Sequence, residues 1–218
     1  MRAAFLLFTI AGYLSAQNSD PMKARLITSD IPHFWSVFDK ASLQNAAELF
    51  QQEYFDIGSE GLKTFVQVRI NNPRELAAVV AARPRYFAAI RENTLSLERN
   101  PEVKAAIQAS FRKLKEIYPD AVFPDVYFLI GAMNTGGTTD GGKGMLIGLE
   151  MNARDEGTPV DELTEWERTV VGQISNVPRM VAHEVIHIEQ KQANASRESR
   201  HPGRMHCAAD LTAAVVPA

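Results

Sequence analysis

The sequence predicts an α+β fold, in which a helical N-terminal half packs on a small β-sheet and on one later helix. Apolar residues recur at helical spacing from Phe34 to Tyr118. Two β-branched and aromatic runs follow at 126–130 and 145–151 and are typical of buried strands. A further amphipathic run begins at Pro178, where a proline fits the first turn of a helix. This change of apolar period along one chain is typical of the α+β class.

Length and composition indicate one ordinary globular domain. The chain has 218 residues, of which 45% are hydrophobic and 22% are charged. The formal net charge of −3 gives no indication of a nucleic-acid or anionic-membrane partner. Cys207 is the single cysteine, which excludes an intramolecular disulfide and a cysteine-rich structural zinc site.

The N-terminus has the pattern of an export signal. Arg2 precedes a mainly apolar run from Ala3 to Leu14, and Ala16 offers a small residue before a cut ahead of Gln17. This run is shorter than the about 20 residues that a membrane span requires. The alternative is an apolar first helix of the folded domain. We predict a signal peptide at 1–16, a polar lead-in at 17–30, a single domain at 31–218, and a secreted or periplasmic location.

Prolines divide the helical half. Asp30 and Pro32 have the pattern of a helix start, and Pro84 must end or kink a helix within the run from Pro73 to Leu97. A helix is expected from Pro101 to about Tyr118. The stretch 60–69 has a helical composition, but apolar and polar residues alternate at 65–68, so a strand is the alternative interpretation.

The two predicted strands are separated by a glycine-rich stretch at 134–142, which has the composition of a turn. The strands are expected either to form a hairpin or to lie as neighbours with a long loop between them. A phosphate-binding loop would need a helix after the glycines, whereas Lys143 and Gly144 are followed by a strand. A loop at the rim of a cleft is the better interpretation.

The chemically informative segment is an H-E-x-x-H motif formed by His183, Glu184 and His187. Residues four apart on an α-helix lie on one face, so both imidazoles can reach the same zinc ion. Glu184 is about 100° further around the helix and projects beside the metal, where it can take a proton from a metal-acidified water. The alternative is a buried helix whose histidines bind carbonyl groups.

A catalytic zinc needs a third protein ligand. The residues after His187 exclude the metzincin spacing, because Gln190 and Ala193 stand where glycine and histidine would be required. His206 is the preferred candidate, since a short helix would place Asp210 on the same face to hold its imidazole. The other candidates are Glu189, Glu198 and His201, of which the first is on another face and the others lie in an arginine-rich stretch.

These residues resemble a bacterial zinc-dependent protease family with a gliding-motility-lipoprotein-B-like domain. The similarity extends from about Ile31 to Leu211, and its strongest parts are 118–120, 126–131, 134–138, 147–151 and 181–187. It implies a zincin-like, gluzincin-type domain with Zn²⁺ as cofactor. By position, His183 and His187 would be ligands and Glu184 the base.

One departure from the family concerns the third ligand. Where the family has Glu-Gly-x-Ala-Asp with glutamate as ligand, this chain has His206-Cys207-Ala208-Ala209-Asp210. The chain also ends soon after Leu211, where the family continues, so a C-terminal truncation is one expectation. Histidine also binds zinc, so the site is expected to survive the exchange.

The expected activity is hydrolysis of peptide or protein substrates by a zinc-bound water with the assistance of Glu184. The strand 145–151 is the expected sheet edge, with Gly148 and Leu149 as substrate-binding residues. The rival interpretation is a non-catalytic, envelope-associated binding protein that retains a vestigial zinc helix. Hydrolysis of a non-peptide amide is a third alternative.

Overall fold

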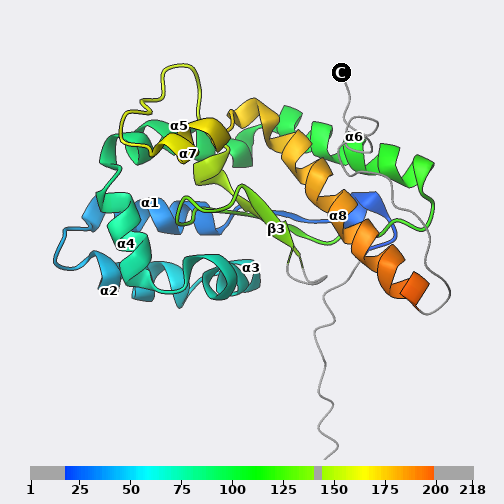
Figure 1. Ribbon diagram of the computed structural model, residues 1–218, viewed down its shortest axis with the longest axis horizontal. Coiled ribbons are helices and arrows are strands. Elements are labelled where there is room, and N and C mark those ends of the chain that lie inside the picture. The colour runs from blue at the N-terminus through cyan, green and yellow to red at the C-terminus, as the bar shows by residue number, and fades with distance from the viewer. Residues whose placement is uncertain (1–17, 140–143, 199–218) are drawn as a thin grey trace, which may run out of the picture.

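The computed structural model describes residues 18–139 and 144–198, with side chains described up to Lys191. It confirms the α+β class, because this part of the chain combines many helices with one small mixed sheet (Figure 1). The predicted signal peptide at 1–16 lies outside the described residues. Among the described helices, none is both long enough and apolar enough to cross a membrane.

The helical half consists, within the described residues, of six α-helices, and single π-turns follow the second and third of them. In chain order its elements are η1 (Pro21–Lys23), α1 (Asp30–Lys40), α2 (Ala46–Phe50), the π-turn η2 (Gln51–Phe55), α3 (Glu60–Phe65), the π-turn η3 (Val66–Ile70), α4 (Pro73–Ala81), α5 (Pro84–Arg99) and α6 (Pro101–Ile117). The ambiguous stretch 60–69 is therefore helical, and the alternation at 65–68 falls at the end of α3 and in the π-turn η3.

Prolines and capping side chains set these helix boundaries. Asn72 and Asn100 cap α4 and α6, because each side-chain oxygen accepts hydrogen bonds from two backbone N–H groups of the first turn. Pro84 is the first residue of α5, as expected for a proline that interrupts an apolar helical run. Phe34 lies at the centre of the buried core of this half. It contacts five aromatic rings: those of Trp35, Phe38, Phe50, Tyr54 and Phe87.

The sheet has the order β1-β2-β4-β3. Its strands are β1 (Leu26–Ile27), β2 (Val126–Leu129), β3 (Gly137–Thr139) and β4 (Met145–Gly148). The two predicted strands are neighbours, but β2 and β4 run parallel, so they do not form a hairpin. The segment 17–30 is more than a lead-in, because β1 within it pairs with β2.

The expectation that 145–151 forms the sheet edge is wrong. β4 lies between β2 and β3, and its chain turns after Gly148 into the 3-10 helix η4 (Leu149–Met151). The edge of the sheet beside helix α8 (Val177–Glu198) is instead β3, which comes from the glycine-rich stretch and pairs antiparallel with β4. Pairing with β4 gives this stretch a strand structure that its turn-like composition does not indicate.

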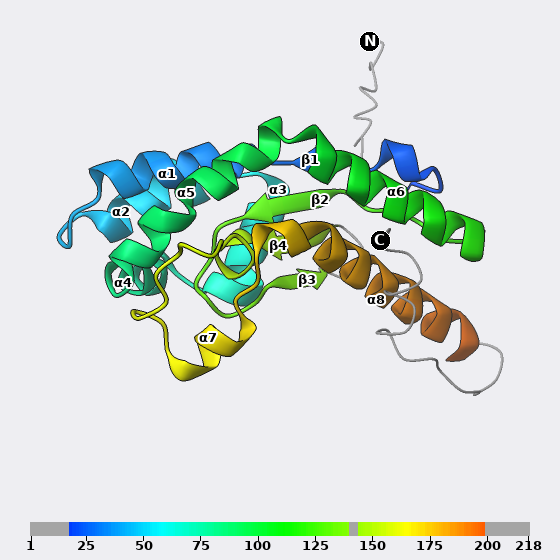
Figure 2. The same ribbon diagram turned by 90° about the horizontal axis from the view of Figure 1, so that it is seen from above.

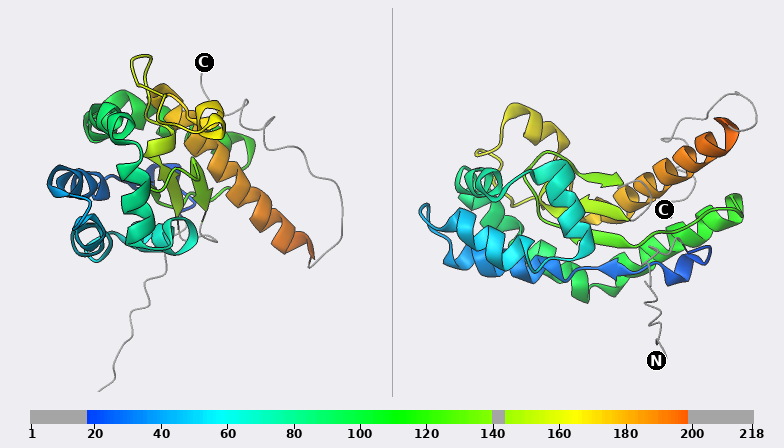
Figure 3. Two further views of the ribbon diagram at one scale, coloured as in Figure 1. Left: turned by 60° about the vertical axis from the view of Figure 1, so that its left-hand side comes forward. Right: turned by 90° about the horizontal axis from the view of Figure 1, so that it is seen from below.

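Helices cover both faces of the sheet. On one face α3 approaches so closely that a Cβ at Gly61 would stand 2.2 Å from the Tyr127 ring of β2. On the other face α8 packs against β3 and β4 and also against α6. Figure 2 shows β2, β4 and β3 side by side, with α8 crossing beside β3, and Figure 3 shows α6 and α8 extending away from the helices α1, α2 and α4.

After the sheet, a loop region with the short helices α7 (Glu165–Val170) and η5 (Ile174–Asn176) leads into α8. A capping box at Thr164 and Glu167 starts α7. Arg83 from the start of α5 forms a largely buried ion pair with Glu167 at 2.8 Å, which ties this region to the helical half. The 3-10 helix η5 leads from this region into α8 and packs against it.

Candidate metal centre on helix α8

The H-E-x-x-H motif lies within the helix α8, as the sequence predicts. The apolar side of the helix is buried through Val177, Val181, Ala182, Val185, Ile186 and Ile188. His183 and His187 remain half-buried on the side that is open to solvent. The helix therefore anchors itself in the core while it presents both imidazoles at the surface.

The two imidazoles converge on one point. Nε2 of His183 and Nε2 of His187 are 2.9 Å apart, and the ring planes are nearly perpendicular at 89°. Burial lowers the pKa of His183, and the neighbouring His187 and Arg179 lower it further. A lowered pKa favours the neutral imidazole, which is the form that binds metals.

Glu184 is buried beside this pair, with only 8% of its surface exposed. Burial raises the pKa of its carboxyl, while the positive charges of His187, Lys191 and Arg69 oppose the rise. The side chain packs against the edge strand: a Cβ at Gly137 would stand 2.9 Å from both Cγ and Oε1 of Glu184. The absence of a side chain at Gly137 therefore leaves the space that this carboxylate occupies.

The spacing of the two histidine nitrogens, 2.9 Å, is compatible with two ligands of one zinc ion. Two nitrogens at about 2.0–2.1 Å from one zinc ion in tetrahedral geometry lie about 3.3 Å apart, close to the observed separation. Within the described residues, no group of three His, Cys, Asp or Glu side chains is placed to hold a metal. The predicted third ligand His206 and its partner Asp210 lie outside the described residues.

Glu189, which the sequence offered as another ligand, has a structural contact instead. Its Oε1 accepts a hydrogen bond from the backbone N–H of Val122 at 2.8 Å. Glu189 is 7% exposed, and burial raises the pKa of its carboxyl. Glu189 thus joins α8 to the segment between α6 and β2, away from the histidine pair.

Gly148 and Leu149 do not line an open edge of the sheet. The N–H of Gly148 donates to the carbonyl of Gly136 at 3.2 Å, and Leu149 is fully buried. Asn152 holds the same region together, because its Nδ2 donates to the carbonyls of Gly136 and Gly148 at 2.7 and 2.9 Å. These residues support the edge strand from within.

Sequence reasoning missed two cations beside the site, Arg69 and Lys191. Arg69 Nη2 donates to Oγ1 of Thr138 at 3.0 Å, and Lys191 Nζ donates to Oγ1 of Thr139 at 2.9 Å. Lys191 lies one helical turn beyond His187, so the helical period of the sequence already predicts that both side chains lie on the same face of α8. No local pattern indicates Arg69, because its partner is 69 positions away in the chain.

A separate apolar groove of about 670 Å³ lies between the end of α1, α2 and α4. Alanines and the rings of Phe38 and Phe50 line it, and Arg74 stands at its rim. Among its lining residues there is no pair of titratable groups. The chemistry that the described residues offer is therefore concentrated on α8 and β3.

No protein-family model, curated protein or solved structure matches the chain. The resemblance to a zinc-dependent protease family accordingly stays a prediction. What the molecule does has to be inferred from the geometry of α8 and of the strand beside it.

Proposed function

We propose that this protein is a zinc-dependent peptidase with a zincin-like domain, exported to the periplasm or the cell exterior. The observation that carries the proposal is the convergence of the two Nε2 atoms of His183 and His187, with a buried carboxylate next to them. His183 and His187 would be two zinc ligands and His206 the third. Asp210 would hold the imidazole of His206.

A zinc ion held by these residues would supply Lewis acidity, which lowers the pKa of a water and polarises the scissile carbonyl. Glu184 then takes a proton from the attacking water and passes it to the leaving amine. Burial suits this role, because a carboxyl with a raised pKa is a stronger base than a solvated one. His183 and His187 would hold the zinc ion through the two Nε2 atoms that α8 places 2.9 Å apart.

The edge strand β3 gives the substrate a place to bind. It is the outermost strand beside α8, and Gly137 within it directly contacts Glu184. An extended peptide that pairs with β3 would run past the carboxylate with its backbone held by strand-like hydrogen bonds. This arrangement replaces the strand 145–151 as the proposed substrate-binding edge.

The test combines metal analysis with digestion of a broad peptide library. The full chain is expected to contain zinc and to cleave peptides, whereas Glu184→Gln should keep zinc and lose about 10²–10⁴-fold in turnover. Glu189→Gln is the matched control, because it changes another buried glutamate of α8 and keeps a carbonyl oxygen for Val122. It should cleave like the parent.

Two results would contradict the proposal. If Glu184→Gln cleaved as fast as the parent, Glu184 would not be the base. If the parent held zinc and cleaved nothing in the library, the non-catalytic binding protein with a retained zinc helix would be the better interpretation. His183→Ala and His187→Ala should each lose zinc in either case.

A further inference from the structure

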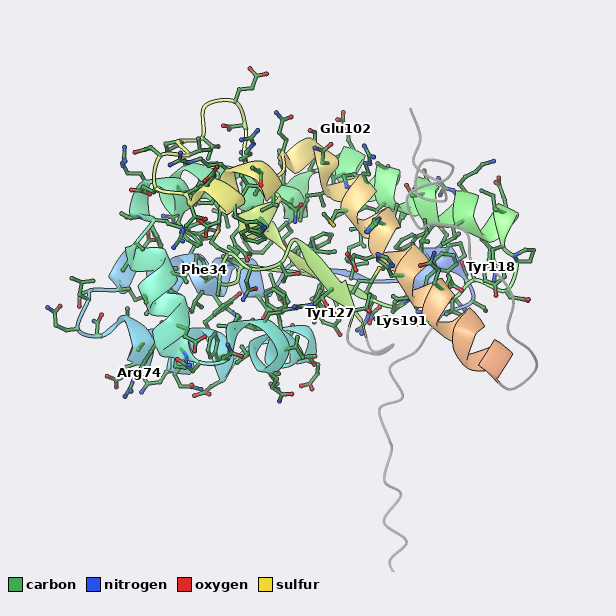
Figure 4. The ribbon with its side chains drawn as sticks, in the orientation of Figure 1. Phe34, Arg74, Glu102, Tyr118, Tyr127 and Lys191 are labelled. Atoms are coloured by element: carbon green, nitrogen blue, oxygen red, sulfur yellow. The ribbon has the colours of Figure 1, made fainter. Side chains whose placement is uncertain are left out.

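Arg69 and Lys191 stand on the two faces of the edge strand β3. Side chains alternate along a strand, so Thr138 points to the face opposite to Gly137 and Thr139. Arg69, from η3, donates to Thr138 at 3.0 Å, and Lys191, from α8, donates to Thr139 at 2.9 Å. Figure 4 shows Lys191 on α8 beside the end of this strand. Two positive charges therefore flank the strand next to Glu184.

Neither cation has a carboxylate partner within the described residues. Arg69 bonds a neutral hydroxyl, and its Nε is buried with no hydrogen-bond partner. Four other arginines of the described residues form ion pairs with acids: Arg25–Asp125, Arg83–Glu167, Arg85–Asp161 and Arg91–Asp39. Arg154 shares with Arg69 a buried Nε that has no hydrogen-bond partner, but Arg69 is the one of the two that bonds the edge strand. The charges of both cations act on the carboxyl of Glu184, but neither forms an ion pair with it, so Arg69 keeps donors for a bound anion.

The backbone around Arg69 is held in an unusual conformation. Arg69 lies in the π-turn η3, and Asn71 just after it has φ 68°. Met133 has φ 57°, and the side chain of the next residue, Asn134, donates to the carbonyl of Arg69 at 2.6 Å. Single π-turns and left-handed non-glycine residues concentrate at functional sites, where surrounding contacts fix a strained geometry.

We propose that Arg69 and Lys191 form a carboxylate-binding subsite that makes the enzyme select acidic peptides. The inference rests on the proposed peptidase function and adds the substrate class. In a peptide paired with β3, the residue opposite Thr138 shares the face of Arg69, and its neighbour shares the face of Lys191. Arg69 keeps donors beyond the one that Thr138 accepts, and its planar group can bind both oxygens of a carboxylate.

The experiment measures peptide binding by the zinc-loaded full chain carrying Glu184→Gln, so that cleavage does not interfere. The probes are fluorescein-labelled Ala/Val/Thr peptides with an amidated C-terminus, in which one Glu is moved along the chain, with matched Gln peptides. A third series lacks Glu and has a free C-terminal carboxylate. At the best position, the carboxylate peptide should bind about tenfold more tightly than its Gln counterpart.

Variants assign the preference to the two cations. Arg69→Met should remove the Glu preference, Arg69→Lys should keep part of it, and Lys191→Met should weaken it. Arg74→Met is the control, since Arg74 is an exposed arginine on α4 and lies far from Lys191 in Figure 4. It should leave the preference unchanged, and thermal unfolding of each variant checks that it is folded.

The outcomes separate this inference from the proposed function. Tighter binding of internal Glu identifies an acidic side chain as the ligand, and tighter binding of the free-acid series identifies the peptide C-terminus. Equal binding of all three series, or a preference that survives Arg69→Met, overturns the inference even if the parent cleaves peptides. A Glu preference in a protein whose parent form cleaves nothing contradicts only the peptidase. Absence of any peptide binding contradicts both.

Discussion

Glu150 and Glu184 are two buried glutamates whose surroundings differ. Glu150 is fully buried, and its Oε2 accepts a hydrogen bond from the backbone N–H of Gly131 at 2.8 Å. Glu184 is buried against the edge strand, beside two histidines and within reach of Arg69 and Lys191. Burial is the largest cause of a raised pKa in both carboxyls.

The difference teaches which buried carboxylate can do chemistry. Glu150 is enclosed by the chain: Cβ atoms at Gly131 and Gly148 would stand 3.0 and 3.2 Å from its Oε1. No substrate can reach it, so its raised pKa has consequences only for stability. Burial also raises the pKa of the Glu184 carboxyl, but this side chain faces the strand edge and the histidine pair. Whether a substrate can reach the carboxylate, more than how far its pKa is shifted, separates a structural carboxylate from a candidate base.

The largest expected effect is the pH dependence of stability caused by Glu150. Its pKa is raised from 4.5 to about 7 in the fold, so the folded protein holds a proton between these values that the unfolded chain releases. This contribution to stability is fully present below the unfolded pKa and is lost as the pH rises to about 7. The loss should amount to about 3 kcal/mol.

Urea unfolding of the parent and of Glu150→Gln at several pH values measures this contribution. Gln keeps an oxygen for the N–H of Gly131 but does not ionise. Relative to the variant, the parent should therefore lose stability between pH 4.5 and 7 and change little above that range. A constant difference between the two proteins across this range would show that Glu150 does not hold a proton in the fold.

The next effect concerns the space that Gly137 leaves for Glu184. In Gly137→Ala the new methyl group would stand 2.9 Å from Cγ and Oε1 of Glu184, so the flexible carboxylate has to move. A displacement of about 1 Å at a reacting group costs about a hundredfold in rate, or about 2.7 kcal/mol of transition-state stabilisation. Turnover of a library peptide should fall by this factor while the unfolding free energy changes little.

Gly136→Ala is the matched control for this substitution. Its added methyl would meet Asn152 at 3.2 Å and Met180 at 3.4 Å, and its three nearest atoms do not include Glu184. If both alanine variants lost the same activity, a general disturbance of β3 would explain the result better than displacement of Glu184.

The sequence predicts the elements that have strong local signals. Helix α8 follows from its apolar period and Pro178, and the start of α5 follows from Pro84. The runs around Val126 and Met145 become strands because their side chains are buried on both faces of the sheet. For the site, the motif alone was enough to predict the side-by-side placement of His183 and His187.

What the sequence does not predict depends on contacts between distant segments. The residues of β3 have the composition of a loop, and they form a strand only because β4 offers a pairing partner. Because this pairing covers the outer side of β4, the predicted edge at 145–151 is wrong. The parallel arrangement of β2 and β4 likewise has no local signature. Arg69 reaches the site through a π-turn and a hydrogen bond from Asn134, 65 positions away. Neither the pairing of distant strands nor a hydrogen bond between distant residues leaves a periodic pattern of apolar residues in the sequence.

The smallest expected effect is the loss of stability on substitution of Glu189, which lies on the side of α8 away from the histidines. Glu189 is as buried as Glu184, but it accepts a hydrogen bond from the N–H of Val122 and lies away from the histidines. Glu189→Ala should reduce the unfolding free energy by about 1 kcal/mol, because the part-buried N–H of Val122 loses its acceptor. Glu189→Gln should recover most of this loss, and both variants should bind zinc like the parent. Loss of zinc from a folded Glu189→Ala would mean that this carboxylate supports the metal centre, and the distinction between structural and chemical glutamates would then fail on α8 itself.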